Sequence, residues 1–161
     1  MPKDNTSSLS ADDIWSALDS TRAGMLQTGP TPFIPMSHQI DRDASVLWFL
    51  TAADTAFGEE VNTAAQPARY VVADTSAGLH GTFEGMIRVE EDRARLDEIW
   101  SPIVGAWFDG KDDPDLRMLR FDLAFAEVWL SDGAAKFFFD IARANITGEE
   151  PDGGRHGTVT F

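Results

Sequence analysis

The sequence predicts one α+β domain, mainly β, in which an antiparallel sheet curls into a small barrel and helices flank it. Short apolar runs alternate with turns rich in Gly, Pro and Asp, and helical spacing occurs between these runs and near the ends. The run from Val46 to Leu50 is apolar at every position, which is typical of a strand buried on both faces. The barrel covers one side of such a strand, so helices or a second subunit must cover the other.

The first half of the chain is expected to begin with an amphipathic helix over residues 11–21, after a loose tail at 1–9. Ser10 and Asp13 have the spacing of a capping box, which satisfies backbone donors at a helix start. The strand at 33–40 contains Pro35, so it belongs at an edge or a bulge. The other elements of this half are strands at 24–29 and 46–51 and a helix at 52–60 capped by Asp54.

The second half is expected to continue with a hairpin of two strands, 69–74 and 79–89. Gly81 and Gly85 lie inside the second of these strands, which indicates a bulge or a close backbone approach. The elements after this hairpin are a helix at 91–100, strands at 118–122 and 126–130, and a helix at 134–144. The domain is thus expected over residues 10–147, with a C-terminal extension over 148–161.

The aromatic segment from Trp100 to Leu116 connects the helix at 91–100 to the following strand. Ser101-Pro102 can open a short helix, because serine caps a helix and proline suits its first turn. Trp107 and Phe108 give that helix more aromatic surface than a small loop needs. They are expected to pack on the core of the domain, on a partner subunit or on a flat ligand.

Composition and charge narrow the classes of function. The net charge of −14 argues against nucleic acid or an anionic membrane as the main partner. The chain has no cysteine, which excludes disulfides, a thiolate nucleophile and a cysteine zinc site. No stretch has the length and apolarity of a membrane span, and the cytoplasm is the expected location.

Histidines and carboxylates offer few candidates for catalysis or metal binding. His38 and His80 fall on predicted strands, where packing or solvation is a more common role than catalysis, and His156 lies in the extension. The acidic cluster of Asp109, Asp112, Asp113 and Asp115 lacks the alternation of a calcium loop, so turn and cap chemistry is the simpler interpretation and no metal site is expected.

A series of short motifs follows in a characteristic order along the chain. They are Pro35-Met36, Leu47-Trp-Phe-Leu-Thr51, Gly81-Thr-Phe-Glu-Gly85, Ile99-Trp-Ser-Pro102, Ala106-Trp-Phe108 and Asp112-Asp-Pro-Asp-Leu116. In this order they resemble the general stress protein 26 group of the FMN-binding split-barrel proteins related to pyridoxamine 5′-phosphate oxidase. The resemblance implies a six-stranded antiparallel split β-barrel with flanking helices, a homodimer, and FMN in two equivalent clefts at the subunit interface.

The resemblance also implies which positions contact the flavin. The ring-side positions are Met36, Gln39 and Leu50. The hydroxyls directed toward the ribityl chain and the phosphate are those of Thr51 and Thr55. Trp107 is expected to wall the flavin cleft or the dimer seam.

The basic residues that hold the phosphate in this group are replaced here by Ile34 and Phe57. A dianionic phosphate without a positive partner loses its charge-assisted hydrogen bonds, which are the strong ones. FMN binding is therefore expected to be weakened or lost unless His38, Arg42 or Arg69 supplies the charge.

Three functional hypotheses follow. The first is a flavin-dependent oxidoreductase with FMN at the dimer interface, where the cofactor performs the electron transfer. The second is a flavin-binding module without turnover. The third is a cofactor-free dimer whose cleft binds a less charged ligand or a protein partner, and the replacements at Ile34 and Phe57 favour it.

Overall fold

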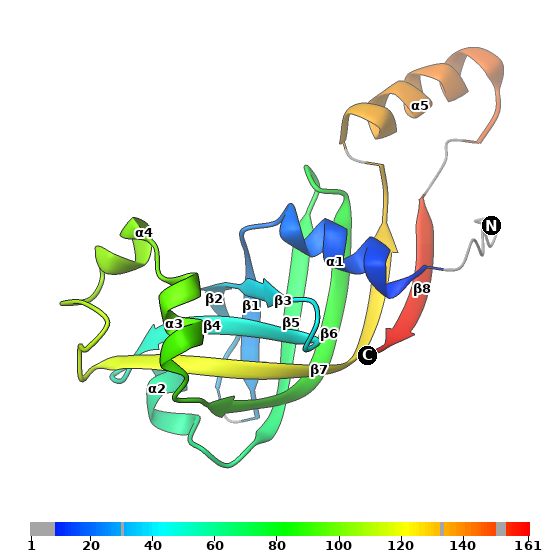
Figure 1. Cartoon of the computed structure of the whole chain (residues 1–161). Helices are drawn as coiled ribbons and strands as arrows, with labels where there is room; N and C mark the ends of the chain where they lie inside the picture. Colours follow the sequence, from blue (N-terminus) through cyan, green and yellow to red (C-terminus); the bar gives the residue numbers. More distant parts are fainter. Residues whose placement is uncertain (1–8, 30, 133, 151–153) are drawn as a thin grey trace.

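The structure, a computed structural model, describes residues 9–29, 31–132, 134–150 and 154–161. The tail predicted over 1–9 lies outside this part of the chain except for Leu9. The elements are α1 (Ala11–Asp19), β1 (Ala23–Thr28), β2 (Ile34–Ser37), β3 (Gln39–Asp41), β4 (Val46–Ala52), α2 (Ala56–Glu60), β5 (Gln66–Asp74), β6 (Leu79–Val89), α3 (Arg93–Ile99), α4 (Pro102–Gly105), β7 (Leu116–Leu130), α5 (Ala134–Thr147) and β8 (Arg155–Thr160). The strands form one curled antiparallel sheet (Figure 1) in the order β2-β1-β5-β6-β7-β4-β3, with β8 paired to β7.

The two ends of this strand order belong to one short stretch of chain. β2 pairs with β1, where Met36 lies opposite Gly24, and β3 pairs with β4, where Gln39 lies opposite Trp48. Only His38 separates β2 from β3, so the predicted strand at 33–40 is present but divided. Within the described residues the sheet has eight strands rather than the implied six, because residues 34–41 form two short strands and β8 is added at the C-terminal end.

The strand β7 is continuous where the sequence predicted two strands, at 118–122 and 126–130. A register shift beside Gly85 leaves Ala124 without a partner on β6, so the extra residue is absorbed as a bulge. A Cβ on Gly85 would lie 2.0 Å from the carbonyl oxygen of Asp122. The predicted bulge and close approach are confirmed, and the prediction of two separate strands is wrong.

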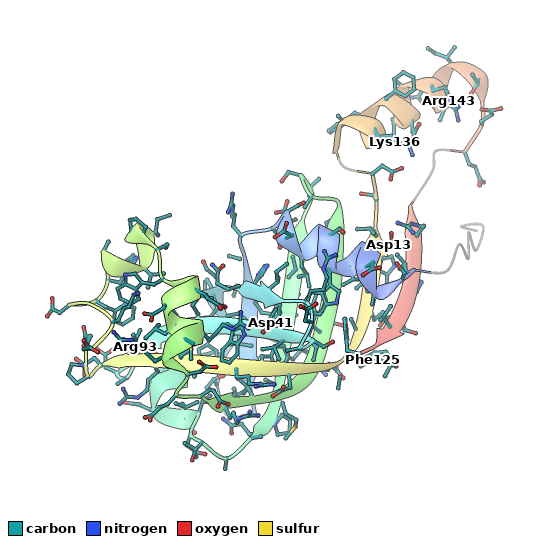
Figure 2. The ribbon with its side chains drawn as sticks, in the orientation of Figure 1. Asp13, Asp41, Arg93, Phe125, Lys136 and Arg143 are labelled. Carbon is teal, nitrogen blue, oxygen red and sulfur yellow. The ribbon has the colours of Figure 1, made fainter. Side chains whose placement is uncertain are left out.

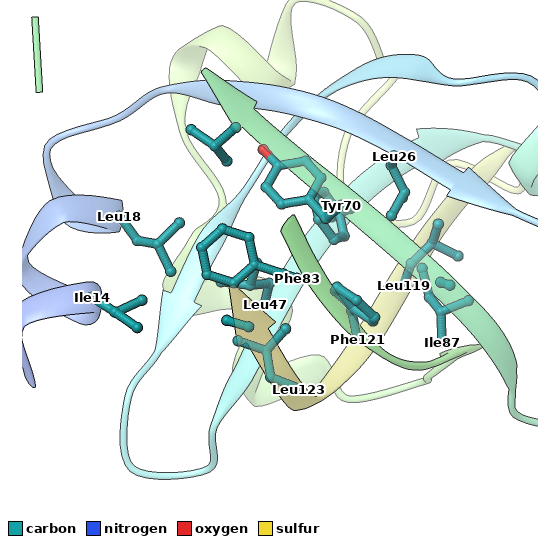
Figure 3. Packing of buried hydrophobic residues seen from close by; sticks show 14 of the residues in the cluster. Ile14, Leu18, Leu26, Leu47, Tyr70, Phe83, Ile87, Leu119, Phe121 and Leu123 are labelled. Carbon is teal, nitrogen blue, oxygen red and sulfur yellow. The ribbon is translucent and has the colours of Figure 1, made fainter. Parts of the chain in front are cut away.

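The main core fills the inside of the curled sheet (Figure 3). Ile14 and Leu18 of α1 pack there with Tyr70, Phe83 and other fully buried side chains of the sheet. The capping box predicted for α1 is confirmed, since the side chains of Ser10 and Asp13 each accept from the other's backbone N–H. The helix therefore covers the barrel with the face that its apolar spacing predicted.

A second, smaller cluster lies on the outer face of β4, under α3. Val46 and Trp48 pack there with Leu96 and Met118, while the alternate residues of β4 point into the main core. The prediction that this strand is buried on both faces is confirmed. Its outer cover within the chain is the helix α3.

The C-terminal part of the chain contains more regular structure than predicted. β8 pairs with residues 125–130 of β7, and α5 runs to Thr147. Figure 1 shows α5 beyond the ends of β7 and β8, away from the body of the barrel. Among the helices that the structure describes, none combines the length and apolarity needed to cross a membrane.

Candidate functional site

The candidate site begins with a row of residues on the outer face of the sheet. Gln39, Trp48, Arg120 and Arg88 lie opposite one another on β3, β4, β7 and β6. Residues directly opposite in antiparallel strands share one face, so these four side chains form a continuous row. α3 lies over part of this face and adds Arg95, whose guanidinium carbon is 5.6 Å from the centroid of the Trp48 ring.

Trp48 is the buried centre of this row. Its side chain is 2% exposed, and Arg120 lies 5.6 Å from its ring centroid, as Arg95 does. Its indole Nε1 has no hydrogen-bond partner within the described part of the chain. A buried donor without an acceptor costs about 1–3 kcal/mol, so this N–H is a local cost to the stability of the fold.

The arginines of the row are paired with carboxylates. Asp122 bridges two of them, accepting from Arg88 Nη1 and from Arg120 Nε, each at 3.0 Å. Without this bridge, the like charges of Arg88 and Arg120 would face each other directly across β6 and β7. Arg95 donates to Asp41 at 2.5 Å, and Figure 2 marks Asp41 beside α3. The cations are therefore committed to partners of this chain.

Two of the three predicted ring-side residues lie on this outer face. Gln39 is exposed and stands opposite Trp48, and Leu50 is half-buried beside Trp48 in the cluster under α3. Met36 instead packs against the main core, and its carbonyl oxygen lies 3.1 Å from the hydroxyl of Tyr70. The structure thus brings Gln39 and Leu50 together and separates them from the Met36 side chain.

The two predicted hydroxyls meet at the start of α2. The Oγ1 atoms of Thr51 and Thr55 lie 2.8 Å apart. Thr55 caps the helix by accepting from the N–H of Gly58 at 3.1 Å, and it donates to the carbonyl of Ala52. The prediction that Asp54 caps this helix is wrong, because the helix starts at Ala56 and Thr55 occupies the cap position. The Thr55 hydroxyl already makes three local contacts.

The positions that lost basic residues have apolar surroundings. Phe57 is fully buried in the main core, and Ile34 is half-buried against the same core. Of the proposed substitutes, Arg69 is paired with Glu84 at 2.9 Å. His38 faces Tyr70 and α1 within the protein. Neither His38 nor Arg69 stands as a free cation beside Ile34.

His38 belongs to a buried polar network that the sequence did not reveal. Its Nδ1 is 2.8 Å from the hydroxyl of Tyr70, and its Nε2 is 3.0 Å from the carbonyl of Leu18 and 3.3 Å from Thr21 Oγ1. The Thr21 hydroxyl donates to that same carbonyl. Nε2 therefore faces acceptors and must carry a proton. Burial lowers the pKa of His38 below its ordinary value of 6.5.

With Nε2 protonated, neutral His38 accepts at Nδ1 from Tyr70. Tyr70 is the one tyrosine in the sequence and lies on a buried strand, which was the available signal for a polar partner in the core. Burial raises the pKa of Tyr70 well above its ordinary range, so the hydroxyl keeps its proton. The interpretation of His38 as a packed histidine is the one that this geometry supports.

Trp107 stands at the edge of the structure on the turn after α4. It is 81% exposed, whereas Phe108 packs at 6.5 Å against Trp100. Of the three partners expected for Trp107, the core of its own chain is therefore ruled out. Ser101 caps α4 as predicted, accepting from the N–H of Val104.

The acidic turn beside Trp107 is held by hydrogen bonds of its own. Asp113 accepts from the backbone N–H groups of Asp109 and Asp115, each at 2.8 Å, and these bonds lower its pKa. Asp112 pairs with Arg93 of α3 at 2.5 Å, and Figure 2 labels Arg93. The Asp113 carboxylate therefore stabilises the turn by accepting from its backbone N–H groups, as expected from the sequence.

The remaining histidines lie at the far end of the sheet. His156 is on β8 rather than in an unstructured extension, and its ring stacks on Trp129 at 4.4 Å. Its Nε2 is 3.0 Å from Glu127. His80 lies opposite Trp129 on β6. Neither histidine reaches the row around Trp48.

Comparison with solved structures gives close relatives of this fold. A general stress protein 26 from Jannaschia sp. CCS1 is 40% identical, with a TM-score of 0.84 over 93% of this chain and 97% of that one. A general stress family protein from Xanthomonas campestris pv. campestris is 31% identical, with a TM-score of 0.67 over 77% and 88%. The general stress FMN/FAD binding protein of Xanthomonas citri is 29% identical, with a TM-score of 0.68 over 77% and 90%.

The family comparison covers most of the chain. No curated protein matches this sequence. Residues 10–152, which run from the cap of α1 past the end of α5, match the family described as pyridoxamine 5′-phosphate oxidase like. With this match and the 40% identical relative, the chain belongs to the pyridoxamine 5′-phosphate oxidase-like family.

Proposed function

We propose that this chain is a flavin-binding split-barrel protein that forms a homodimer and holds the flavin ring at the seam between two copies. The Xanthomonas citri relative, at 29% identity, is named as an FMN/FAD binding protein. Counting β2 and β3 as one strand, we assign this strand together with β1, β4, β5, β6 and β7 to the six strands of the proposed barrel. The observation that carries the proposal is Trp107, which is 81% exposed and needs a flat ligand or a second copy to cover it.

The end of the outer row at Gln39, where the sheet is exposed, suits the ring of a flavin. Flavins carry carbonyl and ring-nitrogen acceptors, which can accept from the exposed amide of Gln39. Leu50, which is half-buried beside Trp48 on the same face, supplies apolar surface. A ligand with acceptors at one edge of an apolar ring matches these groups.

The phosphate of FMN fits this chain less well than the ring does. Phe57 fills the core, Ile34 carries no charge, and the Thr55 hydroxyl is used in capping α2. We therefore propose that the grip on FMN is weakened and that the ring provides most of the affinity. The buried Phe57 also supports the second candidate, a cofactor-free dimer whose groove binds an uncharged ligand.

Oxidoreductase activity is the reaction class that we propose for a flavin-loaded form. A bound flavin supplies electron and hydride transfer, while this chain binds the ring, orients it and excludes water. No side chain has to act as a general acid, so the location of His38 in the core and of His80 and His156 at the far end is compatible with this class.

Titration of the purified protein with FMN and with riboflavin tests the proposal. We expect both to bind, with quenching of flavin fluorescence, and Trp107→Ala to weaken binding of both by roughly tenfold or more. Trp129→Ala is the matched control, because Trp129 is also exposed but stacks on His156 far from the row. If neither flavin binds, flavin function is refuted; if flavin binds, turnover with NADH or NADPH separates an enzyme from a carrier.

A further inference from the structure

The helix α5 presents apolar side chains to solvent. Phe138 and Phe139 are each 67% exposed, and Ile146 is 86% exposed. Ala135 and Ala142 are exposed on the same side, whereas Asp140, Ile141 and Ala144 are less exposed. The less exposed side of α5 also carries the apolar residues Ile141 and Ala144, so α5 has a second apolar face beyond the one that an amphipathic helix turns toward its own chain. Figure 1 shows no part of the barrel over this helix.

The exposed stripe has the spacing of a coiled-coil seam. Ala135, Phe139, Ala142 and Ile146 follow one another at intervals of four, three and four residues. Small and large side chains alternate along it. One helix of this kind cannot fill the spaces beside its own alanines, so it needs a facing surface with large side chains in those places.

A second copy of α5 provides that surface. If two copies run antiparallel about an axis between Asp140 and Ile141, Phe139 lies opposite Ala142 of the second copy, and Ile146 lies opposite Ala135 of the second copy. Each large side chain then meets a small one, at all four contacts of the seam. A two-fold interface has to be self-complementary in this way.

We propose that two copies of this chain associate through α5, packed antiparallel in this register. The contact brings no unpaired charge to the seam, because Lys136 pairs with Asp132 and Arg143 with Glu149 in each copy. Figure 2 marks Lys136 and Arg143 on α5. The interface is separate from the row around Trp48, and it does not rest on flavin binding.

The size of the contact sets its strength. A helix of 14 residues is about 21 Å long, so α5 alone buries less area than a standard interface. We expect association to depend on protein concentration in the micromolar range or above. If the barrels also dimerise, the α5 contact adds a further association step to that dimer.

A swap of side-chain size tests the register with the full-length chain. In sedimentation experiments over a range of concentrations, Phe139→Ala should weaken association by leaving a gap, and Ala142→Phe should weaken it by placing two phenylalanines against each other. The double variant F139A/A142F again sets large against small and should restore the dissociation constant to within a few-fold of the original. We expect each single variant to weaken association by about tenfold.

Cross-linking gives a second readout, because the chain has no cysteine of its own. A mixture of the Phe139→Cys and Ala142→Cys variants should form a mixed disulfide under mild oxidation. A mixture of Ala135→Cys and Ala142→Cys is the control, since these positions are one turn out of register and should cross-link much more slowly.

Three outcomes would overturn the proposal. A chain that stays monomeric at all concentrations has no such contact. If A142F strengthens association and the double variant does not restore the original dissociation constant, the exposed face adheres to apolar surfaces in general, such as another protein or a membrane. Effects of Phe139→Ala on the unfolding temperature of a monomer alone would mean that α5 is covered by its own chain.

Discussion

Removal of one buried hydroxyl, by Tyr70→Phe, tests the network that joins α1 to the barrel. Phenylalanine keeps the ring in the core, so packing is retained and only the hydroxyl is lost. The hydroxyl lies 2.8 Å from His38 Nδ1 and 3.1 Å from the carbonyl of Met36, and it has one proton to donate. The variant therefore leaves the lone pair of Nδ1 buried without a donor.

The expected cost follows from that one unsatisfied group. A buried polar atom without a partner destabilises a protein by about 1–3 kcal/mol, and we take about 2 kcal/mol for His38 Nδ1. For a domain of this size each kcal/mol lowers Tm by about 2–4 °C, so Tyr70→Phe should lower Tm by roughly 4–8 °C at pH 8. Thermal unfolding followed by circular dichroism measures this shift.

A double-mutant cycle identifies the partner. His38→Phe removes the orphaned acceptor, so the second change at Tyr70 should cost less in that background than in the original chain. A Tm for Tyr70→Phe that stays within about 1 °C of the original would refute the assignment of this hydrogen bond. Equal costs in both backgrounds would mean that Tyr70 acts through another contact.

Four further predictions concern pH, backbone approach and charge. Burial lowers the folded-state pKa of His38 below 6.5, so the unfolded chain binds the proton more readily than the folded chain. The free energy of unfolding should therefore fall as pH drops below 6.5. Urea titrations at several pH values measure this dependence, and His38→Gln should reduce it. Gly24→Ala should lower Tm strongly, since its Cβ would lie 2.5 Å from the carbonyl oxygen of Val71, whereas Gly29→Ala, with nothing within 4 Å, should be tolerated. Ile34→Arg should favour FMN over riboflavin by roughly tenfold in fluorescence titrations, and an equal gain for both ligands would contradict a phosphate contact. Phe57→Lys should instead destabilise the fold by about 3–5 kcal/mol without a gain in FMN affinity, because it buries an ammonium in the core; tighter FMN binding would contradict this placement.

Local signals predicted the elements whose ends are set by short-range chemistry. The capping box of Ser10 and Asp13 placed α1, and the apolar run at β4 predicted burial on both faces. Gly85 marked the bulge, because a side chain there would meet the carbonyl of Asp122. These features depend on residues close in sequence or on steric limits of the backbone, so they can be predicted from the sequence.

The features that sequence reasoning missed depend on distant partners. The two predicted strands form one continuous β7 because β6 pairs with both of them. The local sequence of residues 116–130 does not indicate this pairing. The polar core of His38 and Tyr70 comes from β5, the β2–β3 junction and α1 together. Met36 and Gln39 are close in sequence, but they pair with different strands, β1 and β4, and their side chains lie on opposite faces of the sheet.

The junction at His38 has a consequence for how the barrel opens. Residues 34–41 contact β1 with one half and β4 with the other, so the ring of strands is complete only while both halves are attached. Each half is short, and detaching it breaks few backbone hydrogen bonds compared with separating β6 from β7. We therefore expect residues 34–41 to detach before β5, β6 and β7 separate, and their release would expose to water the part of the core that Ile34, Met36 and Ile40 cover.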